Sequence, residues 1–135
     1  MENFICPIKD ERKNKWLILS PIGKLTFRSQ DPDYNDESVS VLKRIFEDYL
    51  ADCQKTNNRP LVAINLLECN FVDANGLGQF VRILQTVNRQ GGEFLIVDAK
   101  DAVAGMLELT RMRMIMKICS TEEFSTIVDT LNEVH

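Results

Sequence analysis

The chain has 135 residues, of which 44% are hydrophobic, and this length and composition predict one domain with its own buried core. Its net charge of −4 argues against a nucleic-acid surface, because such a surface needs a concentrated set of lysines and arginines. No run of about eighteen apolar residues is present, and the first residues lack the basic start and apolar core of a signal peptide, so we expect a cytoplasmic protein without direct membrane insertion.

The first part of the chain predicts two short strands, a loop and a helix. Apolar residues at 16–19 and 25–27 predict strand pieces, because Pro21-Ile22-Gly23 between them is typical of a turn. The polar segment 29–38 predicts a loop. Apolar side chains then recur at helical spacing over 39–53, which predicts a long amphipathic helix.

The second part of the chain predicts strands that alternate with helices. The nearly continuous apolar run at 61–67 is typical of a strand that is buried on both faces of a sheet. Another buried strand is expected at 94–97 and a last strand at 115–119. The expected helices lie at 77–87, at 102–109 and from Ser120 onward. The last helix opens with Ser120-Thr121-Glu122-Glu123, which has the residue order of a capping box.

This alternation predicts an α/β fold with right-handed crossovers. We expect a single domain with a mainly parallel sheet of about four to five strands and about four helices. The domain is expected to cover residues 15–135, and residues 1–14 are expected to form an N-terminal arm or an edge strand.

Residues suited to catalysis or metal binding are scarce. The cysteines form no C-x-x-C pair and the only histidine is His135, so we expect no metal site and interpret as ordinary buried thiols Cys6, Cys53, Cys69 and Cys119. No nucleophile has an adjacent base, and we therefore expect no enzyme activity and no cofactor.

Two further patterns have ordinary explanations. Gly76-x-Gly78 begins like a dinucleotide-binding turn, but Val81 occupies the third glycine position of that fingerprint. Met112, Met114 and Met116 alternate as copper ligands sometimes do, and we interpret them instead as adaptable apolar packing on one face of a strand.

The most informative segment is Asp73-Ala74-Asn75-Gly76-Leu77-Gly78, between an apolar strand and a predicted helix. Such a turn presents backbone N–H groups and the positive end of a helix dipole at one exposed point, which suits an anion or a partner's side chain. Asn75 is interpreted as the helix N-cap, and Asp73 is the alternative cap for the same N–H groups.

The block 65–78, followed by Gly91-Gly92-Glu93-Phe94, resembles the central signature of STAS domains, in particular bacterial anti-sigma factor antagonists. The resemblance extends over about residues 15–134. It implies a protein-binding module that docks an anti-sigma factor or a GHKL-type kinase. The implied partner-binding residues are those of the turn and of the neighbouring loop: Thr26, Asp73, Ala74, Asn75, Gly76, Leu77 and Gly78.

The chain departs from the family pattern at the regulatory position. The family has a serine or threonine directly before the glycine, which the partner kinase phosphorylates, and Asn75 stands there, preceded by Ala74. Neither residue has a hydroxyl, so this turn is expected to be non-phosphorylatable. Lys24 and Thr26 stand where the family usually has acidic residues, which is consistent with neutral drift or with altered partner choice. Arg111 replaces a glycine that often follows the third helix, so that helix is expected to continue past it.

Other functions remain open at this point. One is a STAS scaffold or accessory subunit of a larger complex for stress sensing or lipid transport, and another is a small-ligand sensor. The sequence also leaves a homodimer open.

Overall fold

The structure is a computed structural model that describes residues 8–25 and 37–133, with side chains described outside 37–40 and 130–133. Thr26, Cys6 and His135 lie outside the described residues, as does most of the predicted loop at 29–38.

A five-stranded sheet forms the centre of the domain. Its spatial order is β1-β2-β4-β6-β7, with the bounds Ile8–Lys13, Trp16–Pro21, Leu61–Asn65, Glu93–Val97 and Lys117–Cys119. The pairs β2–β4, β4–β6 and β6–β7 are parallel.

The first pair, β1 with β2, is antiparallel, so the sheet is mixed and the mainly parallel sheet expected from the sequence is corrected. Asn14 and Lys15, both with positive φ, reverse the chain between these strands. A two-residue turn can join only antiparallel neighbours, because a parallel pair needs a crossover of a dozen or more residues.

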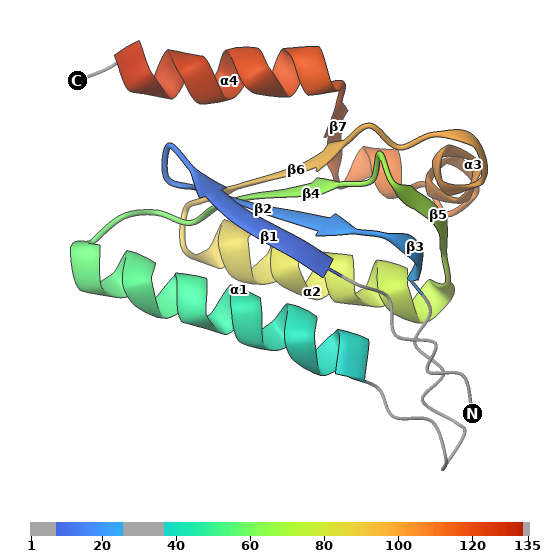
Figure 1. Cartoon of the computed structure of the whole chain (residues 1–135), viewed down its shortest axis with the longest axis horizontal. Helices are drawn as coiled ribbons and strands as arrows, with labels where there is room; N and C mark the ends of the chain where they lie inside the picture. Colours follow the sequence, from blue (N-terminus) through green and yellow to red (C-terminus); the bar gives the residue numbers. More distant parts are fainter. Residues whose placement is uncertain (1–7, 26–36, 134–135) are drawn as a thin grey trace.

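In the described parts of the chain, four helices pack around this sheet, as the sequence predicts (Figure 1). They are α1 (Glu37–Thr56), α2 (Ala74–Arg89), α3 (Asp101–Leu109) and α4 (Thr121–Glu133), and a short 3-10 helix, η1 (Met112–Met114), follows α3. Helices α1 and α2 cover one face of the sheet, α4 lies over the other, and α3 lies at one end of the molecule.

The core has two parts, one on each face of the sheet, because alternate side chains of a strand point to opposite faces. Leu17 and Leu19 of β2 belong to the part that α1 and α2 cover, together with Phe80 of α2. Trp16 and its alternate neighbours belong to the other part, where the Trp16 ring meets Phe124 of α4 edge-on with centroids 5.3 Å apart. Alternate residues of β4 and β6 also divide between the two parts, which confirms that the predicted strands at 61–67 and 94–97 are buried on both faces over 61–64 and 94–97.

Strand β3 (Gly23–Leu25) pairs in parallel with β5 (Cys69–Val72) in a second, two-stranded sheet. Strand β5 was not predicted, because its sequence Cys-Asn-Phe-Val has neither a long apolar run nor strict alternation of apolar and polar residues. Gly23 N–H donates to the Glu68 carbonyl at 2.9 Å, and this pairing positions the chain that enters α2.

The capping box at the start of α4 is confirmed. Ser120 Oγ accepts from Glu123 N–H, and Glu123 Oε1 accepts from Ser120 N–H, both at 3.1 Å. The carboxylate of Asp98, the residue after β6, also accepts hydrogen bonds from the backbone N–H and from the hydroxyl of Thr121. The helix start is therefore tied to the neighbouring strand.

The end of α3 differs from the prediction. The helix ends at Leu109, and Arg111 takes φ 56 in the left-handed region, so the expectation that the helix continues past Arg111 is wrong. Met112 and Met114 lie in η1, which corrects their interpretation as one face of a strand. The chain must turn here, because only a short segment separates α3 from β7.

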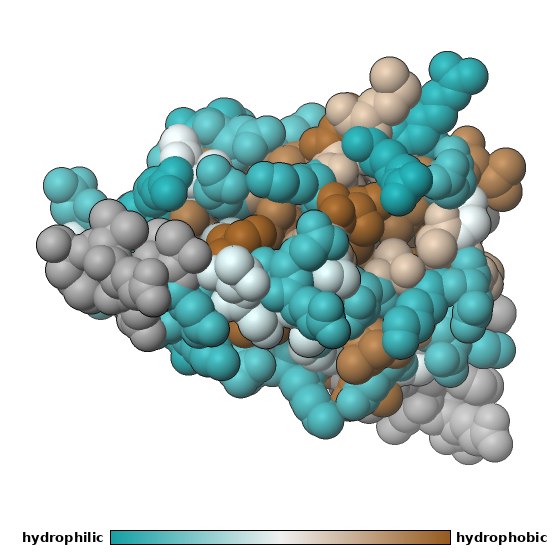
Figure 2. Space-filling model, turned by 90° about the horizontal axis from the view of Figure 1, so that it is seen from above, coloured by the Kyte–Doolittle hydropathy of each residue, from teal (hydrophilic) through white to brown (hydrophobic). Residues whose placement is uncertain are grey.

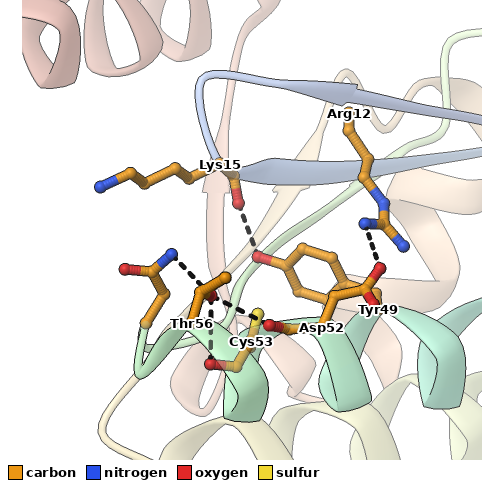
Figure 3. Close-up of polar contacts among 7 residues, drawn as sticks. Arg12, Lys15, Tyr49, Asp52, Cys53 and Thr56 are labelled. Atoms are coloured by element: carbon orange, nitrogen blue, oxygen red, sulfur yellow. Dashed lines mark hydrogen bonds and ion pairs between the residues drawn. The ribbon is translucent and has the colours of Figure 1, made fainter.

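Tyr49 of α1 ties this helix to the sheet (Figure 3). Its hydroxyl donates to the Lys15 carbonyl at 2.6 Å and accepts from Leu61 N–H at 2.8 Å. Arg12 lies over the Tyr49 ring and pairs with Asp52 at 2.6 Å. These contacts give Tyr49 a structural role. Burial also raises the pKa of the Tyr49 phenol, which makes this group a poor candidate for proton transfer near neutral pH.

Candidate functional site

The segment 73–78 follows β5 directly and contains the N-cap and the first residues of α2, and it is held by hydrogen bonds at its start. Asp73 has an extended backbone, its Oδ1 accepts from Gly76 N–H at 2.7 Å, and its carbonyl accepts from Leu77 N–H at 3.0 Å. Asp73 N–H in turn donates to the Leu25 carbonyl of β3 at 3.1 Å. Asp73 is therefore the N-cap of α2, fixed in place by the two-stranded sheet.

Asn75 is not the N-cap, which corrects the preferred interpretation from the sequence. Helix α2 begins at Ala74, so Asn75 is the second residue of its first turn, where its side chain is exposed. Asn and Asp have nearly equal intrinsic preferences for the cap position. The hydrogen bond from Asp73 N–H to the Leu25 carbonyl of β3 holds Asp73, and not Asn75, at the start of the helix.

Gly76 is required by a close approach. A Cβ at this position would lie 2.7 Å from Val72 Cγ1 and 3.1 Å from the Leu25 carbonyl oxygen, so the first turn of α2 packs directly on β3 and β5. Gly78 is different, because a Cβ there would meet no atom within 4 Å. The two glycines of the motif therefore have different roles, which their spacing alone did not reveal.

The other predicted residues divide into buried and exposed groups. Leu77 is 2% exposed and belongs to the core, so its side chain anchors the turn. Ala74 and Asn75 are exposed and form the accessible part of the segment. Lys24 is exposed on β3, where it pairs in register with Phe71 of β5. Thr26 follows β3 directly in sequence, outside the described residues.

The cysteine side chains offer little reactivity. Cys53, Cys69 and Cys119 are buried free thiols, as predicted for these three. Burial raises the pKa of the Cys69 thiol and of the Cys119 thiol, which keeps both protonated and weakens them as nucleophiles or metal ligands. Within residues 8–25 and 37–133, no cluster of three histidine, cysteine or acidic side chains could hold a metal ion.

A hollow of about 490 Å³ is lined by Lys9, Asp10, Glu11 and Ser20, and a groove lies between α1 and α2. The volume of the groove is about 220 Å³, below the range of roughly 300–1,000 Å³ that is typical of ligand pockets. Leu42, Phe46 and Ile83 line it, with Lys43 and Arg82 at the rim. Among the helices that the structure describes, none combines the length and apolar character needed to span a membrane.

Comparison with known proteins adds a family assignment to this geometry. The family model of the STAS domain matches residues 38–125, a range that includes the turn 73–78. A "Putative anti-sigma factor antagonist" homolog from Thermotoga neapolitana is 30% identical over 103 residues, which cover 76% of this chain and 82% of that relative. A relative of the same description from Thermotoga maritima is 28% identical over the same shares.

Solved structures show the same fold. A crystal structure of a "putative anti-sigma factor antagonist" from Thermotoga maritima has a TM-score of 0.70 at 23% identity, and the match covers 90% of this chain and 94% of that one. The anti-sigma factor antagonist SpoIIAA in its unphosphorylated form has a TM-score of 0.62 at 11% identity, with 95% and 100% covered. At these identities the likeness concerns the fold.

Proposed function

The chain belongs to the STAS domain family, and from this premise we propose that it is a protein-binding module of the anti-sigma factor antagonist type. It docks an anti-sigma factor or a related GHKL-type kinase through the turn 73–78. The main support for the proposal is that Ala74 and Asn75 are exposed at the start of α2. The neighbouring Asp73 holds this turn in place, because it is hydrogen-bonded both to Leu25 of β3 and to Gly76 of α2. We place its action in the cytoplasm, where sigma factors act.

The fixed turn supports docking for a physical reason. Asp73 is bonded to β3 and to the first turn of α2, and Gly76 lies tightly against Val72. A surface that is already held in one geometry loses little conformational entropy when a partner binds, so more of the contact energy remains as affinity.

The residue at the phosphorylation position sets the regulation that we propose. A phosphate adds about −1.5 to −2 charges, and in the family that this chain resembles it blocks docking. Asn75 has an amide in place of the hydroxyl, so the kinase cannot add phosphate to this turn. The chain therefore stays competent to dock whatever the state of its partner kinase.

The first test restores the missing hydroxyl. Incubated with ATP and the anti-sigma kinase encoded in the same genome, the wild-type turn should remain unmodified, whereas Asn75→Ser should acquire phosphate at residue 75. Ala74→Ser is the matched control, because it adds the same hydroxyl to the neighbouring exposed residue and should stay unmodified. Intact-mass and fragment mass spectrometry measure both. Phosphate on the wild-type turn would refute the non-phosphorylatable state.

The second test adds charge at the same position. Asn75→Asp should weaken kinase binding by on the order of 1 to 3 kcal/mol if the turn becomes buried in the complex, because it puts a negative charge where the family has phosphate. Asn88→Asp makes the same change on an exposed residue near the other end of α2 and should leave affinity unchanged. If titration calorimetry finds equal affinity for all three proteins, docking occurs elsewhere.

A further inference from the structure

Large apolar side chains are exposed at one end of the molecule. Among the described residues, the exposed large hydrophobic side chains are Leu67 (47%), Phe71 (39%), Leu109 (84%), Met114 (80%) and Ile115 (54%). They come from the region of β5 and from the end of α3 with the segment that follows it, and α3 itself packs against β5. Figure 2 shows brown and pale brown surface interrupted by teal at its right-hand end, which holds α3 and β5 in Figure 1.

The segment 108–117, which we call the α3–β7 corner, supplies the most exposed of these side chains. Its backbone is ordered by hydrogen bonds: Arg111 N–H donates to the Glu108 carbonyl at 3.1 Å, and Ile115 N–H donates to the Met112 carbonyl at 3.0 Å. Met112 packs against the core and Met116 is buried. Met112 and Met116 therefore attach the corner to the core, while Leu109, Met114 and Ile115 remain exposed to solvent.

The charge of the corner is opposite to that of the whole protein. Arg111, Arg113 and Lys117 are exposed there, and Glu108, the single acidic residue of the segment, pairs with Arg113 at 2.6 Å. The complete chain has a net charge of −4. The corner therefore combines apolar side chains with a local excess of positive charge on an otherwise acidic molecule.

We propose that the α3–β7 corner is a second docking surface, separate from the turn 73–78, for a protein segment that carries acidic side chains around apolar ones. Exposed apolar side chains that gather in one patch mark interaction sites, and methionine and arginine are enriched in protein interfaces. The cations supply complementarity to an acidic partner and select against a basic one. This inference does not depend on the proposed anti-sigma function.

The composition of the corner favours a protein over a membrane as its partner. Surface binding to anionic lipid typically uses a longer amphipathic helix with about four to eight cations and apolar residues such as tryptophan, phenylalanine and leucine. The corner has three cations and no aromatic residue, and it is a compact turn with a one-turn 3-10 helix.

The test uses a synthetic amphipathic peptide with leucine along one helical face and glutamate on both flanks. Methyl NMR of the full chain should show shifts at Met114 and Ile115 on titration. The double variant Met114→Gln/Ile115→Gln should bind about tenfold more weakly, because both apolar contacts are lost. Arg111→Gln/Lys117→Gln should also weaken binding and should flatten its dependence on salt.

The controls separate the corner from general electrostatics. Arg44→Gln/Lys55→Gln removes two exposed cations from α1 and should bind the peptide like the wild type, and a peptide with lysine in place of glutamate should not bind. All substituted positions are exposed, and thermal unfolding followed by circular dichroism should be unchanged.

Several outcomes would overturn the proposal. One is absence of peptide binding, and another is binding that the corner variants leave unaltered. A third is corner-dependent sedimentation with phosphatidylglycerol vesicles without peptide binding, which would assign the surface to a membrane. A fourth is a dimer in sedimentation velocity that Met114→Gln/Ile115→Gln abolishes, which would assign it to a second copy of the chain.

Discussion

Substitution of alanine for Gly76 tests the packing of the proposed docking turn. In a helix, alanine is favoured over glycine by about 1 kcal/mol, so an unhindered site should gain stability. At Gly76 the new Cβ would lie 2.7 Å from Val72 Cγ1, closer than ordinary van der Waals contact. Val72 is 1% exposed, and the Leu25 carbonyl, 3.1 Å from the new Cβ, is held by its hydrogen bond from Asp73 N–H.

Overpacking of this kind costs about 1 to 3 kcal/mol, which exceeds the gain in helix propensity, so Gly76→Ala should destabilise the protein by about 1 kcal/mol on balance. Gly78→Ala is the matched control in the same helix. Its Cβ would meet no atom within 4 Å, so it should stabilise by about 0.5 to 1 kcal/mol.

Urea unfolding followed by circular dichroism measures both changes, with the slope m compared to verify that the unfolding transition is the same. Opposite signs are expected for the two substitutions. If both variants gain stability equally, the first turn of α2 does not pack closely against β3 and β5, and the docking turn is not fixed by that packing.

The remaining predictions concern the helix cap and alkaline stability. Asp73→Ala should cost about 1 kcal/mol of stability by removing the cap, whereas Asn75→Ala should stay within about 0.5 kcal/mol, and equal losses in urea unfolding would show that the cap is assigned wrongly. Burial raises the pKa of the Tyr49 phenol, so the folded state holds this proton more tightly than the unfolded state does. Stability from this group is fully present below the ordinary phenol pKa of about 10 and falls as the pH rises above it. Tyr49→Phe should be less stable than the wild type near neutral pH, because two hydrogen bonds are lost. Above about pH 10, the urea midpoint of Tyr49→Phe should decline less steeply with pH than that of the wild type. An equally steep decline in both proteins would mean that another group is responsible.

Several features could be predicted from the sequence because their causes are local. The apolar runs of β4 and β6 and the helical spacing in α1 and α2 depend on neighbouring residues, so their periods can be read directly. The capping box of Ser120 and Glu123 is equally local, because both partners lie within four residues of each other. The segment 73–78 was found by its residue order, and the family model matches the range that contains it.

Other features depend on contacts between distant parts of the chain, which no periodicity reports. Asp73 caps α2 because its N–H bonds to Leu25, 48 positions earlier, and Gly76 must be a glycine because Val72 and Leu25 meet at that point. The antiparallel partner of β2 and the strand β5 likewise form only when the pairing of strands is settled.

In the α3–β7 corner too, the sequence shows which residues are apolar, but only the tertiary structure shows which of them are exposed. Leu109, Met114 and Ile115 are apolar in the sequence, and nothing in their spacing distinguishes them from buried Met116. The left-handed turn at Arg111, made where α3 must end and β7 must begin, determines which of these side chains enters the core and which remains exposed. Exposure is a property of the folded surface, because it depends on what the rest of the chain covers.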